Sequence, residues 1–194
     1  MHTPWGESEE QQTYAKGITF YQTPSHGGFH VLPDQNAKIH TAWRREDGWY
    51  EEDCDWAIVA MTFPDLFDAE HVESARNTAK AWHPHAYMAV TGETLEPKDS
   101  FVLQRQLFAK KHADDWVVVA ALSSKTRPGM VDCIAIKGGQ GSHGPERRFL
   151  IPSEEYKPGQ FGFVVPNGTY PYFDGPRPLW DDVSYVDPSP REAV

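Results

Sequence analysis

The segment 116–122, with the sequence Trp-Val-Val-Val-Ala-Ala-Leu, is the part of the chain that most restricts its fold. Seven consecutive apolar residues rich in valine predict a strand, and the lack of polar alternation predicts burial on both of its faces. Further strand-like runs follow at 131–136, 149–151 and 161–165. Strands that follow one another closely favour an antiparallel arrangement. We therefore expect a mainly antiparallel C-terminal sheet, followed by an irregular C-terminal tail over 166–194.

Helical periodicity dominates the part of the chain before this sheet. Apolar residues recur every three or four positions in 51–63 and in 68–82, and Asp68 is placed to cap the second of these helices. A third helix is expected over 98–112. A short strand is expected over 87–90.

Two short strand-like runs, 18–21 and 29–32, flank a turn and predict an N-terminal hairpin. The polar residues 1–15 show no clear period and are expected to be loose, as are 186–194. Helices early and strands late predict the α+β class, with the hairpin and about three helices packed on the C-terminal sheet. The length of 194 residues fits a single domain, 1–194.

The charge balance restricts the class of partner. The chain has 18 Lys and Arg against 28 Asp and Glu, a net charge of −10. This charge repels phosphate backbones, so direct nucleic-acid binding is disfavoured, while an acidic surface that mimics nucleic acid stays open. Cys54 and Cys133 have no spacing typical of a disulfide framework or a zinc site. No apolar signal core and no membrane-length run are present, so we expect a cytoplasmic protein.

The most distinctive candidate site is the turn 23–30, Thr-Pro-Ser-His-Gly-Gly-Phe-His. Pro24 restricts the backbone and the pair Gly27–Gly28 permits positive φ, which predicts His26 near the hairpin tip. A neutral imidazole can serve as a base or a metal ligand near pH 7. His26 and His30 are candidate metal ligands, although this spacing brings two rings to one ion on a helix and not in a turn. The alternative is an exposed polar tip whose glycines serve only the turn.

An acidic cluster, Glu51, Glu52 and Asp53, lies at the expected start of a helix. Carboxylates in a first helical turn complement the helix dipole, which is a sufficient reason for their presence. The functional alternative places one of them against His26, where it would orient the imidazole or complete a Zn, Mn or Fe site. These three acids are therefore candidate catalytic partners of His26. Cys54 could pair with His26 as a nucleophile, but the neighbouring carboxylates favour an inert thiol.

Six motifs are spread along the chain: TPWG at 3–6, TPSHGGF at 23–29, WYEEDCDWA at 49–57, DWVVVAA at 115–121, RRFLIP at 147–152 and FGFV at 161–164. Their combination resembles an uncharacterised domain family of proteobacterial plasmid and phage proteins. The resemblance assigns no catalytic role to any residue. It implies an accessory protein of a mobile element in a bacterial cytoplasm, and proteins of that kind often blunt host defences.

Two functions follow from these observations. The first is a phage or plasmid accessory protein that binds a host protein, for example as a counter-defence inhibitor, since an acidic, tryptophan-rich surface suits such docking. The alternative is a small, metal-assisted enzyme that uses His26 with Glu51, Glu52 or Asp53. The distance between the His26 ring and these carboxylates discriminates between the two.

Overall fold

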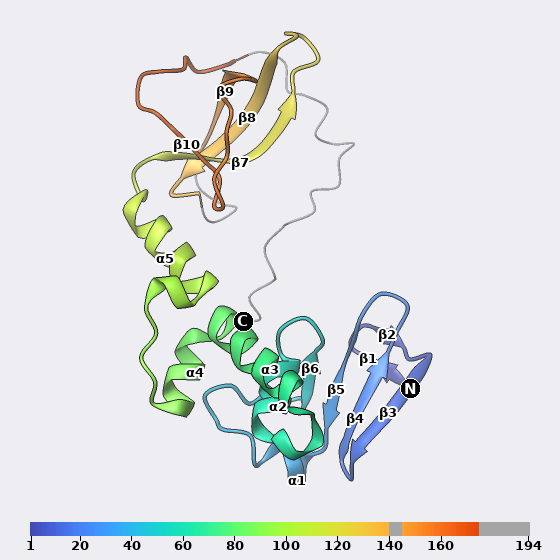
Figure 1. Cartoon of the computed structure of the whole chain (residues 1–194). Coiled ribbons are helices and arrows are strands. Elements are labelled where there is room, and N and C mark those ends of the chain that lie inside the picture. Colours follow the sequence, from blue (N-terminus) through green and yellow to red (C-terminus); the bar gives the residue numbers. More distant parts are fainter. Residues whose placement is uncertain (140–144, 175–194) are drawn as a thin grey trace. The chain divides into compact units, whose positions relative to one another are not determined.

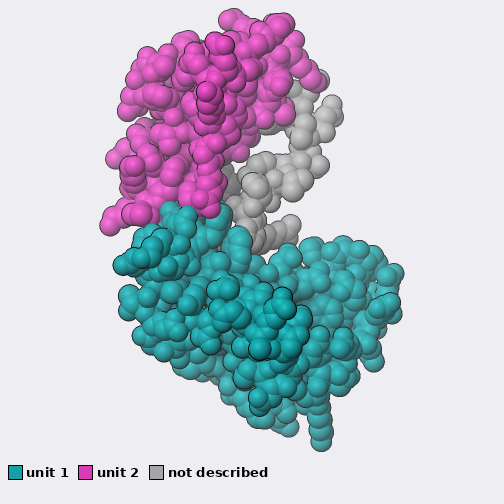
Figure 2. Space-filling view, in the orientation of Figure 1, with its two compact units in different colours: residues 1–106 teal, residues 107–194 magenta. Residues whose placement is uncertain are grey.

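The computed structural model describes residues 1–139 and 145–174 (Figure 1). The chain divides into two compact units, 1–106 and 107–194, which Figure 2 colours separately. Helices and antiparallel sheets are both present, which confirms the predicted α+β class. Organisation as a single domain stays a prediction. The C-terminal residues expected to be loose, 186–194, lie outside the described part of the chain.

The N-terminal unit contains a four-stranded antiparallel sheet in the order β3-β4-β5-β6. Its strands are β3 (Glu10–Ala15), β4 (Ile18–Gln22), β5 (Gly27–Val31) and β6 (Trp49–Glu51). Two shorter strands, β1 (His2–Thr3) and β2 (Gly6–Glu7), pair separately. The predicted hairpin is confirmed as β4 and β5.

The expectation that residues 1–15 are loose was wrong. The strand β3 lies at the edge of the sheet, and four of its six residues are exposed, so it lacks the apolar alternation by which a half-buried strand is recognised. Its Tyr14 ring still packs on Phe29, with 5.1 Å between ring centroids. The pair β1–β2 is closed by Thr3, whose hydroxyl donates to the Gly6 carbonyl at 2.9 Å.

The described residues form five α-helices, of which α1 lies between β5 and β6 and the other four lie between the two sheets in the sequence. They are α1 (Pro33–Asn36), α2 (Trp56–Thr62), α3 (Ala69–Trp82), α4 (Pro84–Thr91) and α5 (Phe101–Lys111). Asp68 caps α3 as predicted, since its carboxylate accepts from the His71 backbone N–H at 2.8 Å. The strand predicted at 87–90 was wrong, because these residues lie in α4 with Tyr87 fully buried. A short apolar run does not distinguish a strand from a buried helical turn.

The helix α2 forms the centre of the N-terminal core. Its residues Ala57, Ile58, Val59 and Ala60 are all at most 1% exposed, and the helix packs against α3, β5 and β6. The sequence prediction placed the helices on the C-terminal sheet, whereas α2 packs on this N-terminal sheet. The end of β6 is consequently held between β5 and the helical layer.

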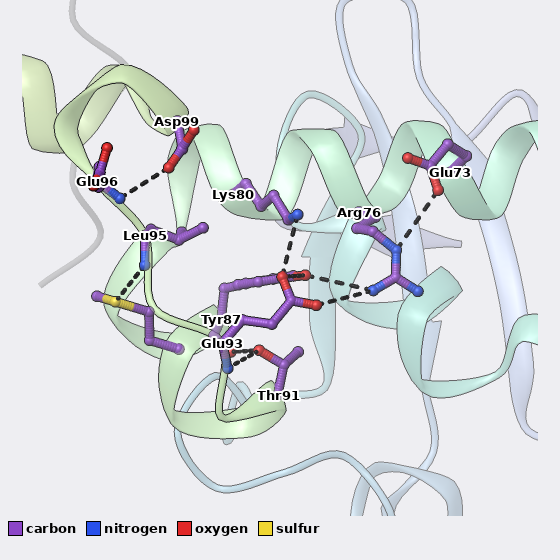
Figure 3. Close-up of polar contacts among 10 residues, drawn as sticks. Glu73, Arg76, Lys80, Tyr87, Thr91, Glu93, Leu95, Glu96 and Asp99 are labelled. Carbon is purple, nitrogen blue, oxygen red and sulfur yellow. Dashed lines mark hydrogen bonds and ion pairs between the residues drawn. The ribbon is translucent and has the colours of Figure 1, made fainter.

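A polar network on α3 and α4 fastens the segment after α4 (Figure 3). The Tyr87 hydroxyl donates to Glu93 at 2.9 Å, and Lys80 lies 3.2 Å from the same carboxylate. Arg76 adds a weaker ion pair to Glu93 at 3.8 Å. These contacts bring together two helices and the loop that follows Gly92, whose φ of 73° ends α4.

The C-terminal unit contains the predicted antiparallel sheet, in the order β10-β7-β8-β9. Its strands are β7 (Trp116–Ser123), β8 (Met130–Lys137), β9 (Glu146–Pro152) and β10 (Phe163–Val165). Burial on both faces holds only for the first three residues of β7, since the rest are half-buried or exposed. Of the tail expected to be irregular, 166–174 carries a single bridge, Phe149 to Tyr172, and 175–194 lies outside the described residues.

Candidate metal centre

The turn between β4 and β5 is closed by Thr23 and presents His26. The Thr23 hydroxyl donates to the His26 carbonyl at 2.6 Å and accepts from the His26 backbone N–H at 3.1 Å. The backbone adds a third bond, from Thr23 N–H to the same carbonyl at 2.8 Å. Thr23 is only 2% exposed, whereas the His26 side chain is 51% exposed. The histidine therefore has a fixed backbone and an accessible ring, as the predicted hairpin tip requires.

Two carboxylates reach this turn from the end of β6. Glu51 pairs with Gly28 in the β5–β6 ladder, and the Glu52 backbone N–H donates to the Gly27 carbonyl at 3.0 Å. This pairing brings Glu51 and Glu52 to His26, so that one ligand atom of each lies within 4.8 Å of the others. The shortest separation recorded is 3.9 Å, from His26 Nδ1 to Glu51 Oε1.

The glycine pair has a different role from the one predicted. Neither Gly27 nor Gly28 has positive φ, since both are strand residues. A Cβ on Gly27 would lie 2.6 Å from Glu52 Oε2. A Cβ on Gly28 would lie 2.3 Å from the Trp5 ring and 2.6 Å from the Tyr50 carbonyl. The glycines therefore leave room for the close approach of neighbouring groups to β5.

Glu51 has an unusual electrostatic environment. Burial raises the pKa of this carboxyl, and a hydrogen bond from the Asp53 backbone N–H to Oε2, at 2.8 Å, offsets this only in part. The other oxygen, Oε1, is buried and has no hydrogen-bond partner among the described residues. A buried carboxylate oxygen without a partner is costly unless a proton or a cation satisfies it.

His30 does not join this group. Its ring stacks on Trp49, with ring centroids 4.3 Å apart and planes 20° apart. Burial lowers the His30 pKa, and the charge of Asp47 opposes this. The structure therefore brings together His26, Glu51 and Glu52 and leaves the candidate ligand His30 elsewhere on the sheet.

The acidic cluster is not the start of a helix, which corrects the prediction. Glu51 ends the strand β6, four turn residues follow, and α2 begins only at Trp56. Asp53 is exposed and its carboxylate lies outside the three-residue group. Burial and then the charges of Glu51, Asp53 and Asp55 raise the pKa of Cys54 to about 12, so a thiolate at this position is disfavoured.

A second charged group, which the sequence did not reveal, lies at the start of α2. Arg45 binds Asp55 through two hydrogen bonds of 2.9 and 3.1 Å. His83 Nε2 is 3.1 Å from the same carboxylate, although not aligned for a hydrogen bond. Burial pushes the Asp55 pKa upward, but the contacts with His83 and Arg45 outweigh it and hold the pKa below its usual range. The pair Arg44–Arg45 and an acid before an apolar run were the only signals.

The fold and the site define an α+β protein with a candidate metal centre on its N-terminal sheet. The family model described as a domain of unknown function, DUF7007, matches residues 1–113, and the chain belongs to this family. The match includes His26, Glu51 and Glu52, and it is consistent with the uncharacterised family that the motifs resemble. No curated protein and no solved structure matches the chain. Among the described helices, none has both the length and the apolar character needed to cross a membrane.

Proposed function

We propose that the protein is a small metal-dependent enzyme whose N-terminal unit binds one divalent cation through His26, Glu51 and Glu52. The observation that supports this most directly is the buried Glu51 Oε1, which lacks a hydrogen-bond partner in the described part of the chain and faces His26 Nδ1 at 3.9 Å. That separation is too long for a hydrogen bond. It suits two ligands of a shared ion.

The ligand spacing agrees with this proposal. Two atoms that each lie about 2.1 Å from one ion are about 3.0 Å apart at 90° and about 4.2 Å apart at 180°. The 3.9 Å between His26 and Glu51 falls in this range. The limit of 4.8 Å for the whole group exceeds about 4.2 Å, so binding of one ion would bring the three ligand atoms closer together. One imidazole with two carboxylates suits Zn, Mn or Fe.

Three protein ligands on an accessible turn favour a catalytic ion over a structural one. Structural zinc sites use four protein ligands, whereas catalytic sites keep a position for water or substrate. An ion here would lower the pKa of a bound water and polarise a substrate oxygen. Asp53 lies next to the ligands in the chain and remains a candidate acid–base partner.

The test is calorimetric titration of the chelator-treated full chain with Mn²⁺ and with Zn²⁺. We expect one ion per chain in the wild type. We expect the affinity to be at least about tenfold weaker in His26→Ala and Glu51→Gln, since each variant removes one of the three proposed ligands. Two matched controls, His2→Ala and Glu46→Gln, change exposed residues outside the group and should bind as the wild type does. No binding, or equal binding by all five proteins, would refute the metal centre.

We also propose, as a second candidate, the mobile-element accessory function in a bacterial cytoplasm, in which the protein binds a host protein and inhibits a defence system. The acidic balance of the N-terminal unit favours this candidate, because residues 1–106 contain 17 Asp and Glu against 8 Lys and Arg. Such a surface complements a basic partner surface and repels phosphate backbones. Pull-down from host lysate at low and high salt tests it, and failure to recover a salt-sensitive partner would count against it.

A further inference from the structure

The C-terminal unit contains a cavity that the proposed metal centre does not use. Its volume is about 370 Å³, and it lies between the sheet and the segment 166–172. Aromatic rings and polar loop residues share its wall, among them Trp116, Phe149, Tyr170, Tyr172, Asn167 and Thr169. Cavities of about 300–1,000 Å³ with this mixture are typical of small-ligand sites.

Two cations lie against the rings of this wall. The Arg147 guanidinium is 3.9 Å from the centroid of Tyr172 and 5.0 Å from that of Trp116. The Lys137 ammonium is 4.7 Å from the Trp116 centroid. Both positive charges are thus held beside the cavity by cation–π contacts.

Neither cation has an acidic partner among the described residues. Within residues 1–139 and 145–174, no carboxylate lies within ion-pair distance of Arg147 or Lys137. Lys137 instead donates to the backbone carbonyl of Asp114. The exposed Arg147 fork therefore keeps its N–H donors for an incoming group, and a planar fork binds carboxylate or phosphate through two bonds.

The charge of the unit permits an anion to approach. Residues 107–194 contain 10 Lys and Arg against 11 Asp and Glu, so the unit is close to neutral. Asp132 is buried and paired with Arg148 at 2.8 Å, so its charge is compensated internally. Nearly all of the excess of acid in the whole chain lies in residues 1–106.

We infer that this cavity binds a small organic anion that carries an aromatic ring. The ring would pack against Trp116 and Phe149, and its phosphate or carboxylate would be bound by Arg147 with support from Lys137. Neither charge nor ring alone would bind as tightly, because the wall offers aromatic partners for the ring and the Arg147 guanidinium beside it offers a partner for the charge.

Adenosine monophosphate is the probe that tests this inference, titrated into the full chain by calorimetry. Two partial probes serve as controls, since adenosine lacks the charge and inorganic phosphate lacks the ring. We expect adenosine monophosphate to bind about 10- to 100-fold more tightly than either, the equivalent of one or two charge-assisted hydrogen bonds.

The variant Arg147→Met keeps an apolar stem and should lose a similar factor of affinity for adenosine monophosphate. Lys157→Met changes an exposed cation of the same unit that makes no cation–π contact with the described rings, and it should leave the affinity unchanged. A circular dichroism melt of each variant verifies the fold. No binding of adenosine monophosphate at millimolar concentration, or equal binding of adenosine, would overturn the inference. Unchanged affinity in a folded Arg147→Met protein would also overturn it.

Discussion

The two compact units differ strongly in net charge. Residues 1–106 have a net charge of −9, from 17 acidic and 8 basic side chains, whereas residues 107–194 have a net charge of −1, from 11 acidic and 10 basic side chains. The N-terminal unit assembles carboxylates beside one histidine, and the C-terminal unit holds cations on aromatic rings. Nearly all of the net charge of −10 therefore lies in the N-terminal unit. The total charge does not exclude an anionic ligand from the nearly neutral C-terminal unit.

The largest losses of unfolding free energy, and the clearest difference between the two units, are expected when the arginine of each unit's central ion pair is replaced. Asp132 is 4% exposed, and Arg148 is its ion-pair partner within the described residues, so Arg148→Met leaves a buried charge uncompensated and should cost about 3–5 kcal/mol of unfolding free energy. Arg45→Met should cost less, about 1–3 kcal/mol, because Asp55 keeps His83 at 3.1 Å. Urea denaturation measures both. Equal losses of unfolding free energy in the two variants would contradict this expectation.

The next largest loss of stability is expected for replacement of Thr23, because this residue closes the turn that carries His26. Thr23→Val removes the hydroxyl and both of its bonds to His26, which should cost about 1–2 kcal/mol and weaken Mn²⁺ binding. Thr23→Ser keeps the hydroxyl and should retain most of both. Parallel titration and urea denaturation separate the two effects. Full Mn²⁺ affinity in Thr23→Val would show that the turn does not position the ligand.

The Asp55 group should make stability depend on pH. Its folded pKa is lowered, so its contribution is present above the unfolded value of about 3.9 and is lost as the pH falls through the folded value. The stability gap between wild type and Asp55→Asn should thus be widest near neutral pH, begin to close below about pH 4 and vanish once the pH is below the folded pKa. The exposed control Asp65→Asn should show no such gap. A gap that persists in acid would contradict the assignment.

The network in Figure 3 should have the smallest effect. Glu93 is solvent-exposed, with its pKa lowered by the Tyr87 hydroxyl and then by Lys80. Exposed pairs are screened by salt, so Glu93→Gln should lower the melting midpoint slightly at low ionic strength and hardly at all in about 1 M salt. A large loss that salt does not remove would indicate a role beyond surface pairing.

Local signals allowed the sequence to predict the hairpin of His26, the Asp68 cap and the C-terminal strands. Turn residues, capping spacing and apolar runs all act within a few positions. The polar edge strand β3 was missed because edge strands need no apolar face. Glu51 was assigned to a helix because carboxylates before an apolar period suit a helix start. Its true place depends on pairing with Gly28, a long-range contact without a local signal.

In the candidate site, too, the sequence predicted the local features and missed those that depend on long-range contacts. His26 was identified because its turn is local, and the proximity of Glu51 was only an alternative. The Arg45–Asp55–His83 group joins three separate segments and was not predicted. The role of Gly27 was also misread, because close approach to Glu52 is a tertiary requirement and not a turn requirement.

The metal centre is tested most directly by one thermal-unfolding comparison of wild type and Glu51→Gln, with and without Mn²⁺. Burial raises the pKa of Glu51, so its ionised form opposes folding above that pKa, and this cost is relieved as the pH falls. At pH 7 without metal, Glu51→Gln should therefore melt no lower than the wild type. Mn²⁺ should raise the midpoint of the wild type clearly more than that of Glu51→Gln. Equal stabilisation of both proteins, or of neither, would contradict the proposed metal centre.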